Sequence, residues 1–177
     1  MRFFLPLILF IPLAAAAQQN AEVPGAVPGA CHSAGHRQFD FWVGDWTVSA
    51  NGQTAGTNSI QSIHNGCALQ ENWQGAGNGG VSGTSLNLYD TGSGQWHQTW
   101  VDSTGTLLLL NGGLVDGSMV LSGRQDAPGG AGTVLNRIRW TPNDDGSVRQ
   151  LWEASRDDGA NWDVLFDGLY TRVPSDE

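Results

Sequence analysis

From Trp46 to the end of the chain, apolar and polar side chains alternate in short segments that glycine-containing turns separate. Asn-Gly and Asp-Gly pairs, such as Asn51-Gly52 and Asp116-Gly117, stand between many of these segments and favour tight hairpins. No window in this part of the chain repeats its apolar residues at the period of a helix. The pattern predicts an all-β antiparallel sandwich or up-and-down barrel of about ten strands. The strands are expected near residues 46–51, 57–64, 67–74, 82–90, 95–102, 106–112, 118–123, 133–141, 147–155 and 162–172.

Tryptophans recur in the same phase as selected polar residues. The stretch GQWHQTWVD spaces Trp96, Gln98, Trp100 and Asp102 two residues apart, so they share one face of a strand. A buried aromatic side chain removes about 150–250 Å² from water, which favours turning the tryptophan-bearing face inward. The same face in other strands carries Leu69, Glu71, Trp73, Ile138, Trp140, Val148, Gln150, Trp152, Trp162, Val164, Phe166, Tyr170 and Arg172.

Two segments depart from this alternation. The run of leucines at 107–110 has no phase, so we expect that strand to be covered on both sides. The strand around Ile60 is also poorly phased, which is typical of a β-bulge.

The chain begins with a basic residue, an apolar run and the small residues Ala15-Ala16-Ala17, which are the features of a secretory signal peptide. We therefore expect a cleaved signal at 1–17, a proline-bearing flexible leader at 18–30 and a barrel domain at 31–177. A turn or short helix should precede the first strand and end at Gly44. The apolar run is shorter than a membrane-spanning helix, so we expect a secreted or periplasmic protein without stable membrane insertion.

The charge balance excludes several partners. The chain has no lysine and carries a net charge of −9. Nucleic acids and anionic membranes draw affinity from clustered Lys and Arg, so neither is an expected partner. The absence of lysine also excludes Schiff-base chemistry and a Walker-type phosphate loop. Oligomeric state is not indicated by any pattern.

Cys31 and Cys67 are the two cysteines. In an exported protein such a pair most simply forms one disulfide, which the chain-entropy model values at about 4 kcal/mol for a loop of this length. The alternative is a metal site built from Cys31, His32 and His36, but this spacing matches no common zinc pattern. We expect a disulfide and no metal.

Two short motifs resemble the calycin superfamily, which includes lipocalins, fatty-acid-binding proteins and nitrobindin-like barrels. The first is FDFWVGDW, residues 39–46, which contains Gly44-x-Trp46 at the start of the first strand. The second is LYTRV, residues 169–173, in which Arg172 matches the late arginine that lipocalins place across that tryptophan. The whole mature chain is also similar to an uncharacterised family of secreted bacterial lipocalin-like proteins.

The resemblance implies an up-and-down barrel with Gly44, Trp46 and Arg172 as structural residues at its closed end and a small ligand in its lumen. Fatty-acid-binding proteins use an Arg-x-Tyr pair for the ligand carboxylate, whereas the order here is Tyr170-x-Arg172. Nitrobindin-like haem binding needs a late histidine, and no histidine follows His97. Neither a fatty acid nor a haem is therefore expected, and no cofactor is predicted.

An inward tryptophan face would also carry polar residues into the lumen. A mostly apolar lumen with a few placed polar groups is typical of a ligand site, whereas the alternative is a filled core whose polar groups bond one another. A buried Glu71 would need a donor such as Gln98 or Arg172. The predicted ligand-binding residues are Glu71, Trp73, Trp96, Gln98, Trp100, Asp102, Trp140, Gln150, Trp152 and Tyr170.

The sequence favours a binding protein over an enzyme, with two alternatives left open. Glu71 or Asp102 could move a proton in an isomerase or cyclase reaction, since an aromatic lumen raises the pKa of a carboxyl group. No Gly-x-Ser-x-Gly elbow is present and His97 is expected to face solvent, which leaves nucleophilic catalysis unsupported. The second alternative is an envelope interaction module with an exposed patch of Leu151, Leu165 and Leu169.

The segment SRDDGANW, residues 155–162, fits the pattern of an Asp-box hairpin. Asp-boxes recur in propellers, which need repeated blades, but this one occurs once. It predicts a local hairpin turn.

Overall fold

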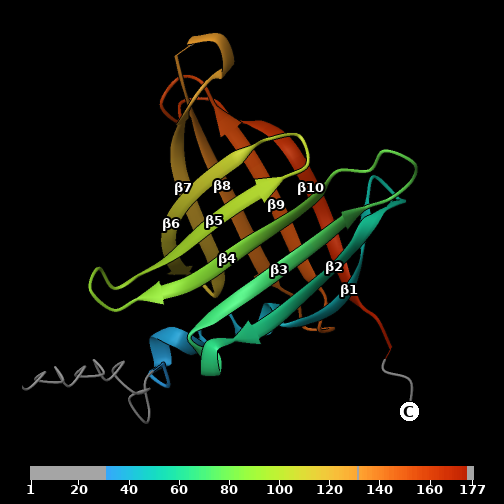
Figure 1. The fold of residues 1–177 in the computed structure, drawn as a ribbon, viewed down its shortest axis with the longest axis vertical. Coiled ribbons are helices and arrows are strands. Elements are labelled where there is room, and N and C mark those ends of the chain that lie inside the picture. The colour runs from blue at the N-terminus through green and yellow to red at the C-terminus, as the bar shows by residue number, and fades with distance from the viewer. Residues whose placement is uncertain (1–30, 131, 175–177) are drawn as a thin grey trace, which may run out of the picture.

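The structure is a computed structural model that describes residues 31–130 and 132–174. Ten antiparallel strands form a closed barrel in which each strand pairs with its neighbours in sequence and the last strand pairs with the first (Figure 1). The predicted up-and-down barrel is thus confirmed, whereas the predicted signal peptide and leader lie outside the described residues. The strands are β1 (Gly44–Ala50), β2 (Gln53–Ile63), β3 (Ala68–Gly75), β4 (Ser82–Asp90), β5 (Gln95–Asp102), β6 (Leu107–Val115), β7 (Ser118–Asp126), β8 (Thr133–Pro142), β9 (Val148–Ser155) and β10 (Asp163–Arg172).

The turn residues form the hairpins that their chemistry favours. Asn51-Gly52 joins β1 to β2 and Asp116-Gly117 joins β6 to β7, and all four residues have positive φ. Positive φ at both central residues is the requirement of a type I′ turn, which Asn-Gly and Asp-Gly satisfy. These turns set the register of β1 with β2 and of β6 with β7.

The inner face is aromatic, as predicted. Trp96 and Trp140 are fully buried in the lumen, while Trp73, Trp100 and Trp152 are partly buried against the same core. Their neighbours Arg137 and Arg149 point outward, where they form ion pairs with Glu153 and Asp167 on adjacent strands. The barrel therefore has the half-buried sheet that the alternation indicated.

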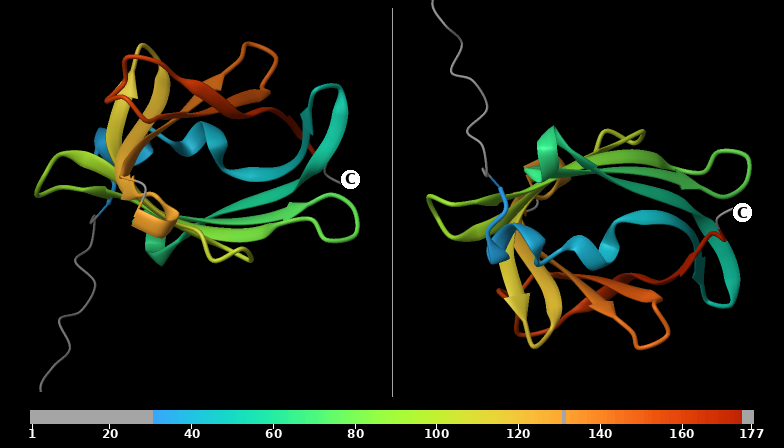
Figure 2. Two further views of the ribbon diagram at one scale, coloured as in Figure 1. Left: turned by 90° about the horizontal axis from the view of Figure 1, so that it is seen from above. Right: turned by 90° about the horizontal axis from the view of Figure 1, so that it is seen from below.

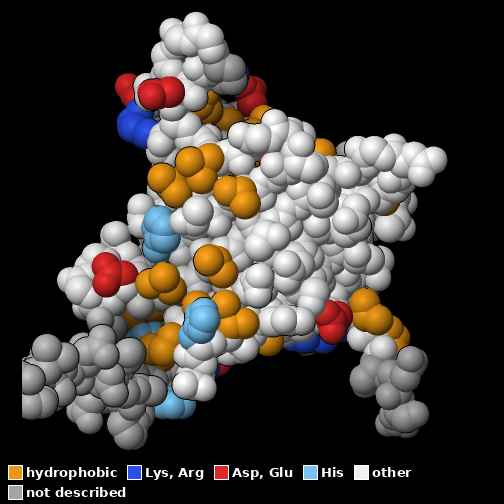
Figure 3. Space-filling view, viewed as in Figure 1, with side chains coloured by type: hydrophobic (Ala, Val, Ile, Leu, Met, Phe, Trp, Pro, Cys, Tyr) orange, Lys and Arg blue, Asp and Glu red, His pale blue; other side chains and the backbone are white. Residues whose placement is uncertain are grey.

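The leucine run in β6 is not covered on both sides, contrary to the prediction. Leu108 and Leu110 are buried, whereas Leu107 and Leu109 are about half exposed. A run of identical apolar residues hides the strand period, because the outward positions are apolar too. The outward leucines belong to an apolar outer face across β4, β5 and β6, seen as orange patches in Figure 3. Its members are Leu86, Leu88, Val101, Leu107 and Leu109.

A bulge in β10 overturns the predicted phase at the start of that strand. Val164 and Phe166 pair with consecutive residues of β9, so the register shifts at Leu165 between them. As a result Val164 is exposed, and Leu165 both lines the lumen and remains about half exposed. Of the predicted outer patch, Leu165 and Leu169 are exposed and Leu151 is half-buried. Trp162 also differs from its predicted inward position, since it packs on the outer face under the guanidinium of Arg137 at 3.8 Å.

The irregularity predicted near Ile60 lies earlier in β2. The pairing of β1 with β2 shifts between Val48 and Ser49, which leaves Ala55 of β2 without a partner. Ile60 itself pairs regularly and is buried. The glycine and threonine residues around the bulge obscured its position in the sequence.

The segment before β1 closes one end of the barrel. It contains two short 3₁₀ helices, η1 (Ala34–Arg37) and η2 (Asp40–Trp42), which cross the lower opening in Figure 2. Phe39 stacks on Trp42 with ring centroids 4.8 Å apart and contacts Trp96 and Trp140 inside the barrel. This confirms the predicted short helical segment before Gly44. We call residues 31–43 the plug, because their aromatic side chains fill this end of the lumen.

Three further contacts fix this segment. A disulfide joins Cys31 to Cys67, directly after the short helix η3 (His64–Gly66) between β2 and β3, which confirms the predicted pairing. The indole of Trp46 donates a hydrogen bond to the carbonyl of Trp42 at 2.9 Å. Arg172 lies over the ring of Trp46 at 4.3 Å and donates to the carbonyl of Val43 at 3.0 Å. Gly44, Trp46 and Arg172 thus meet at the closed end of the barrel.

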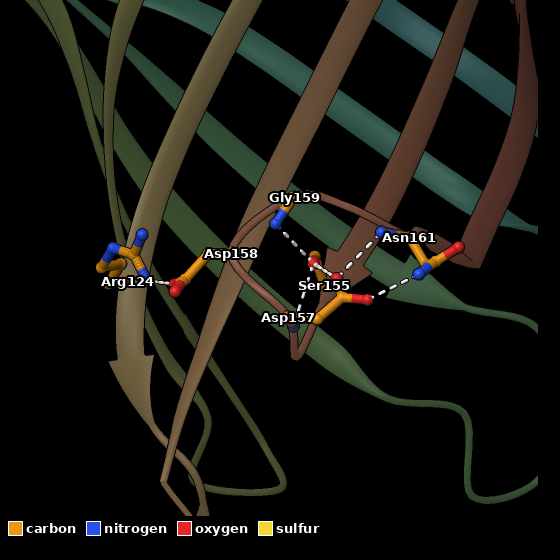
Figure 4. Close-up of polar contacts among 6 residues, drawn as sticks. All are labelled: Arg124, Ser155, Asp157, Asp158, Gly159 and Asn161. Atoms are coloured by element: carbon orange, nitrogen blue, oxygen red, sulfur yellow. Dashed lines mark hydrogen bonds and ion pairs between the residues drawn. The ribbon is translucent and has the colours of Figure 1, made fainter.

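The predicted Asp-box is a hairpin turn between β9 and β10 (Figure 4). The hydroxyl of Ser155 accepts hydrogen bonds from the backbone of Asp157 and Gly159, and Asp157 accepts two from Asn161. The side-chain hydrogen bond from Asn161 is the largest of several that lower the pKa of Asp157 to about 2. Arg124 of β7, two strands from β9, pairs with Asp158 at 2.6 Å. A short helix, η4 (Pro128–Gly130), follows β7.

Replacing Trp46, which anchors the plug through its hydrogen bond to Trp42, tests how much this contact contributes to the stability of the fold. Trp46→Ala should lower the free energy of unfolding by about 3–5 kcal/mol, because it removes a fully buried indole. Arg172→Ala should cost about 1 kcal/mol, since its guanidinium is exposed over the ring. Urea denaturation measures both losses.

The matched control is Arg149→Ala, which removes an arginine from an ion pair on the outer face of the barrel. Exposed ion pairs contribute less than about 1 kcal/mol, so its midpoint should stay close to that of the unaltered protein. An unchanged midpoint for Trp46→Ala would contradict the role of the plug.

Candidate functional site

A cavity of about 290 Å³ occupies the end of the lumen opposite the plug. Figure 2 (left) looks toward this end of the barrel. All of the predicted ligand-binding residues line the cavity except Trp96. Its lining residues are Glu71, Trp73, Val81, Gln98, Trp100, Asp102, Thr104, Leu108, Ile138, Trp140, Gln150, Trp152, Leu165, Phe166 and Tyr170.

Trp96 lies deeper in the barrel, against the plug. Its ring packs edge-on against Phe39, and its indole donates to the carbonyl of Gly35 at 3.1 Å and to Gln38 at 3.2 Å. Strand parity put Trp96 on the correct face, but parity does not give depth along the barrel axis. The segment that covers Trp96 comes from outside the sheet, so strand periodicity gave no sign of it.

Inward-facing glycines keep the cavity open. A Cβ atom on Gly83 would lie 2.2 Å from the Trp100 ring, one on Gly56 would lie 2.8 Å from the Trp73 ring, and one on Gly168 would lie 2.4 Å from the Phe166 ring. Each ring therefore lies in space that any side chain larger than glycine would occupy at that position. Glycine costs strand stability, and here an aromatic ring covers it.

A buried hydrogen-bond network forms the polar side of the cavity. Glu71 is only 4% exposed. One of its carboxylate oxygens accepts from the amide of Asn58 at 2.7 Å, and the other accepts from the hydroxyl of Ser85 at 2.6 Å. The donor is thus neither Gln98 nor Arg172, contrary to the prediction. Gln98 reaches the carboxylate only indirectly, through Asn87 and Ser85, and Arg172 lies at the closed end.

Sequence reasoning missed Asn58 and Ser85, although both had a usable signal. Asn58 is in phase with Ile60 in β2, and Ser85 is in phase with the inward positions of β4. The register then sets Ile60 beside Glu71 and Ser85 on its other side. Leu165 was also missed as a cavity residue, because the bulge in β10 has no clear sequence signal, whereas Phe166 was predicted on the inward face but not as a ligand contact.

Burial dominates the acid–base properties of this network. Removal from water raises the pKa of Glu71 to about 6, although the hydrogen bonds from Ser85 and Asn58 partly oppose the shift. Burial, followed by the nearby charge of Glu71, raises the pKa of Tyr170 well above 10, so its hydroxyl stays protonated. That hydroxyl accepts from Asn58 and donates to Gln150.

Asp102 lies nearer the mouth and behaves differently. Partial burial would raise its pKa, but hydrogen bonds from Thr104, Trp100 and Thr106 together outweigh burial, so its pKa lies below its usual range. One oxygen accepts from Thr104 and Thr106, and the other accepts from the Trp100 indole at 3.2 Å. Asp102 therefore stays ionised wherever Glu71 titrates.

One further polar group of the cavity wall has no partner. Trp140 is 1% exposed, and its indole N–H has no acceptor among the described residues. Buried donors are almost always paired in folded proteins. Within the described residues, the indole N–H of Trp140 is thus an unsatisfied buried donor behind the cavity wall.

The histidines lie away from this cavity. His97 is on the outer face of β5, where it bonds Asn111 and Thr99 at 2.9 Å. His36 bonds Ser33 beside the plug. In the described ranges, 31–130 and 132–174, no three His, Cys, Asp or Glu side chains come together in a way that could hold a metal ion. No helix in those ranges is both long and apolar enough to span a membrane.

The fold and cavity define the protein as a closed antiparallel β-barrel with one plugged end and an aromatic chamber at the other. The family described as "Protein of unknown function (DUF1579)" matches residues 32–172, which run from the plug to the end of β10. The chain belongs to this DUF1579 family. A search of curated proteins found no match.

The raised pKa of Glu71 predicts a specific pH dependence of stability. The folded protein keeps this proton up to about pH 6, whereas the ordinary pKa of a glutamate side chain is 4.5. Its contribution to stability is therefore present below about pH 4.5 and is lost as the pH rises through about 6. The shift corresponds to at most about 2 kcal/mol.

Glu71→Gln isolates this effect. Between about pH 4.5 and pH 7 the unaltered protein should lose up to about 2 kcal/mol of stability relative to the variant. Denaturant titrations across this range measure the difference. Carboxylates with lowered pKa values, such as Asp102 and Asp157, are common to both proteins and cancel. Parallel stability curves for the two proteins would contradict the assignment.

Proposed function

We propose that this DUF1579 protein is a lipocalin-like barrel that binds a small amphipathic or aromatic molecule in its lumen. The observation that carries the proposal is the aromatic cavity, which has the composition of a ligand site: mostly apolar walls with a few polar groups. Its volume of about 290 Å³ lies near the lower end of such sites, which suits a small ligand.

The arrangement at the closed end supports the lipocalin-like assignment. The calycin resemblance implies that a late arginine lies across the tryptophan of Gly-x-Trp, and Arg172 lies over the ring of Trp46 at 4.3 Å. The two residues are also direct partners in the β1–β10 register. In this proposal the packing around the plug stabilises the barrel, and the cavity at the opposite end binds the ligand.

We place the protein outside the cytoplasm, in the periplasm or the extracellular medium. The Cys31–Cys67 disulfide is compatible with that location, because such bonds persist in oxidising compartments. The cleaved signal peptide expected at 1–17 is the second support for this assignment.

A second candidate function is proton transfer on a bound ligand. Glu71 favours it, because a carboxyl group with a pKa of about 6 in an aromatic cavity suits a general base or acid near neutral pH. Asp102 is less suited, because its lowered pKa makes it a weaker base.

Hydrogen exchange tests this second candidate. Any compound that binds is incubated with the protein in D₂O, and deuterium in the compound is followed by mass spectrometry. Turnover requires exchange that is lost in Glu71→Gln and kept in Asp45→Asn, which removes an exposed carboxylate at the closed end. If no bound compound exchanges, the protein binds without proton transfer.

Filling the cavity tests the binding function itself. The neutral fluorophore phenylnaphthylamine should bind the unaltered protein and brighten in the apolar lumen. Gly83→Val should weaken this binding at least tenfold, because the new side chain pushes the Trp100 ring into the cavity. The fluorescence titration gives both dissociation constants.

Thr84→Val is the matched control, because Thr84 is the next residue of β4 and faces outward. It should bind the dye as tightly as the unaltered protein. Equal binding by Gly83→Val and Thr84→Val would place the dye outside the lumen and contradict the proposal. Circular dichroism confirms that both variants keep the barrel.

A further inference from the structure

We propose that the cavity selects ligands that join a positive charge to an apolar body, such as protonated amines or quaternary ammonium ions. This inference rests on the proposed binding function and specifies the chemical class of its ligand. It is drawn from three features of the cavity: the sign of its charges, the position of its aromatic rings and the spare capacity of its carboxylates.

The charges of the cavity have one sign. Glu71 and Asp102 are its ionisable acids, and none of the described residues that line it is Arg or His. The chain has no lysine at all. On the strands around the cavity, Arg137 and Arg149 turn outward to acidic partners. A ligand carboxylate would therefore enter a chamber with two negative charges and no cation to pair with.

The strand register places one indole at the level of each carboxylate, two strands away. Glu71 of β3 is opposite Ser85 of β4, which is opposite Trp100 of β5. Trp73 is in turn opposite Gly83, which is opposite Asp102. Successive inward residues of a strand are about 7 Å apart. The cavity thus has two levels, and each contains one carboxylate and one tryptophan.

Three aromatic rings of the cavity wall lie against glycines, within reach of a bound molecule. Trp100 rests against Gly83, Trp73 against Gly56 and Phe166 against Gly168. All three rings line the cavity, and those of Trp73 and Phe166 pack edge to face with their centroids 6.1 Å apart. Ring faces attract cations, most strongly for tryptophan and where water is excluded.

The carboxylates can still accept further hydrogen bonds. Each oxygen of Glu71 has one side-chain donor, and one oxygen of Asp102 has only the Trp100 indole. An ionised carboxylate can accept about four hydrogen bonds. Burial also makes the charge of Glu71 costly, as the rise of its pKa to about 6 reflects. A ligand cation would compensate that charge, whereas a neutral ligand would not.

Three probes with the same ring system separate charge from shape. They are naphthylmethylamine, which is protonated at neutral pH, naphthalenemethanol, which is neutral, and naphthoate, which is an anion. Isothermal titration at pH 8 should give the amine an affinity about tenfold or more above that of the alcohol. The anion should bind more weakly than the alcohol.

Carboxylate variants locate the preference. Glu71→Gln and Asp102→Asn should each reduce the ratio of the amine affinity to the alcohol affinity severalfold. Asp45→Asn removes an equal charge at the closed end and should leave the advantage intact. This control separates the cavity carboxylates from the overall negative charge of the protein.

Lowering the pH from 8 to 5 should weaken amine binding, because Glu71 gains a proton near pH 6. The other titratable residues of the lining do not obscure this change. Asp102 stays ionised because its pKa is lowered, and Tyr170 stays neutral because its pKa is raised. The pH dependence should be absent in Glu71→Gln.

The outcomes distinguish the two proposals. An amine preference that the cavity variants reduce supports the cationic ligand class. Equal or stronger binding of the anion overturns that class but leaves the binding function standing, as does an amine preference that both cavity variants retain. If none of the three probes binds, and phenylnaphthylamine does not bind either, both proposals fail.

Discussion

Aromatic packing at one end of the barrel is the constraint on which the rest of the structure depends. Phe39 and Trp42 enter from the segment before β1 and stack against Trp96 and Trp140 inside the sheet. A ten-stranded barrel encloses more space than its own side chains fill near the axis. The plug supplies the missing volume at one end only. The remaining volume at the other end is the cavity.

The same division separates the two roles of the tryptophans. Those near the plug, Trp46 and Trp96, are fully buried and have their indole nitrogens bonded to backbone carbonyls. Those near the mouth, Trp73 and Trp100, lie over glycines and face the cavity. Tryptophans on the inner face of the barrel therefore pack the core near the plug and line the cavity near its mouth.

Much of this fold could be read from the sequence, because strand period and hairpin chemistry are local. Asn51-Gly52 and Asp116-Gly117 fixed their turns, and the alternation around Trp96 fixed which face was inside. Parity also brought Glu71, Gln98, Asp102 and Gln150 to one cavity. Strand parity could not show how deep a residue lies along the barrel axis or how neighbouring strands pair. Trp96 packs against the plug, which comes from outside the sheet. The bulge in β10 brought Leu165 to the cavity. The hydrogen-bond partners of Glu71 lie on neighbouring strands, so they depended on how the strands pair.

The disulfide has a consequence for how molecules would come and go. Cys31 is bonded to the turn after β2, while the other end of the plug continues into β1 at Gly44. The plug is thus tethered at both of its ends and cannot swing away as a flap. A molecule bound in the cavity would then have to leave from the opposite end, where Val81 and Thr104 line the cavity from the connections after β3 and β5.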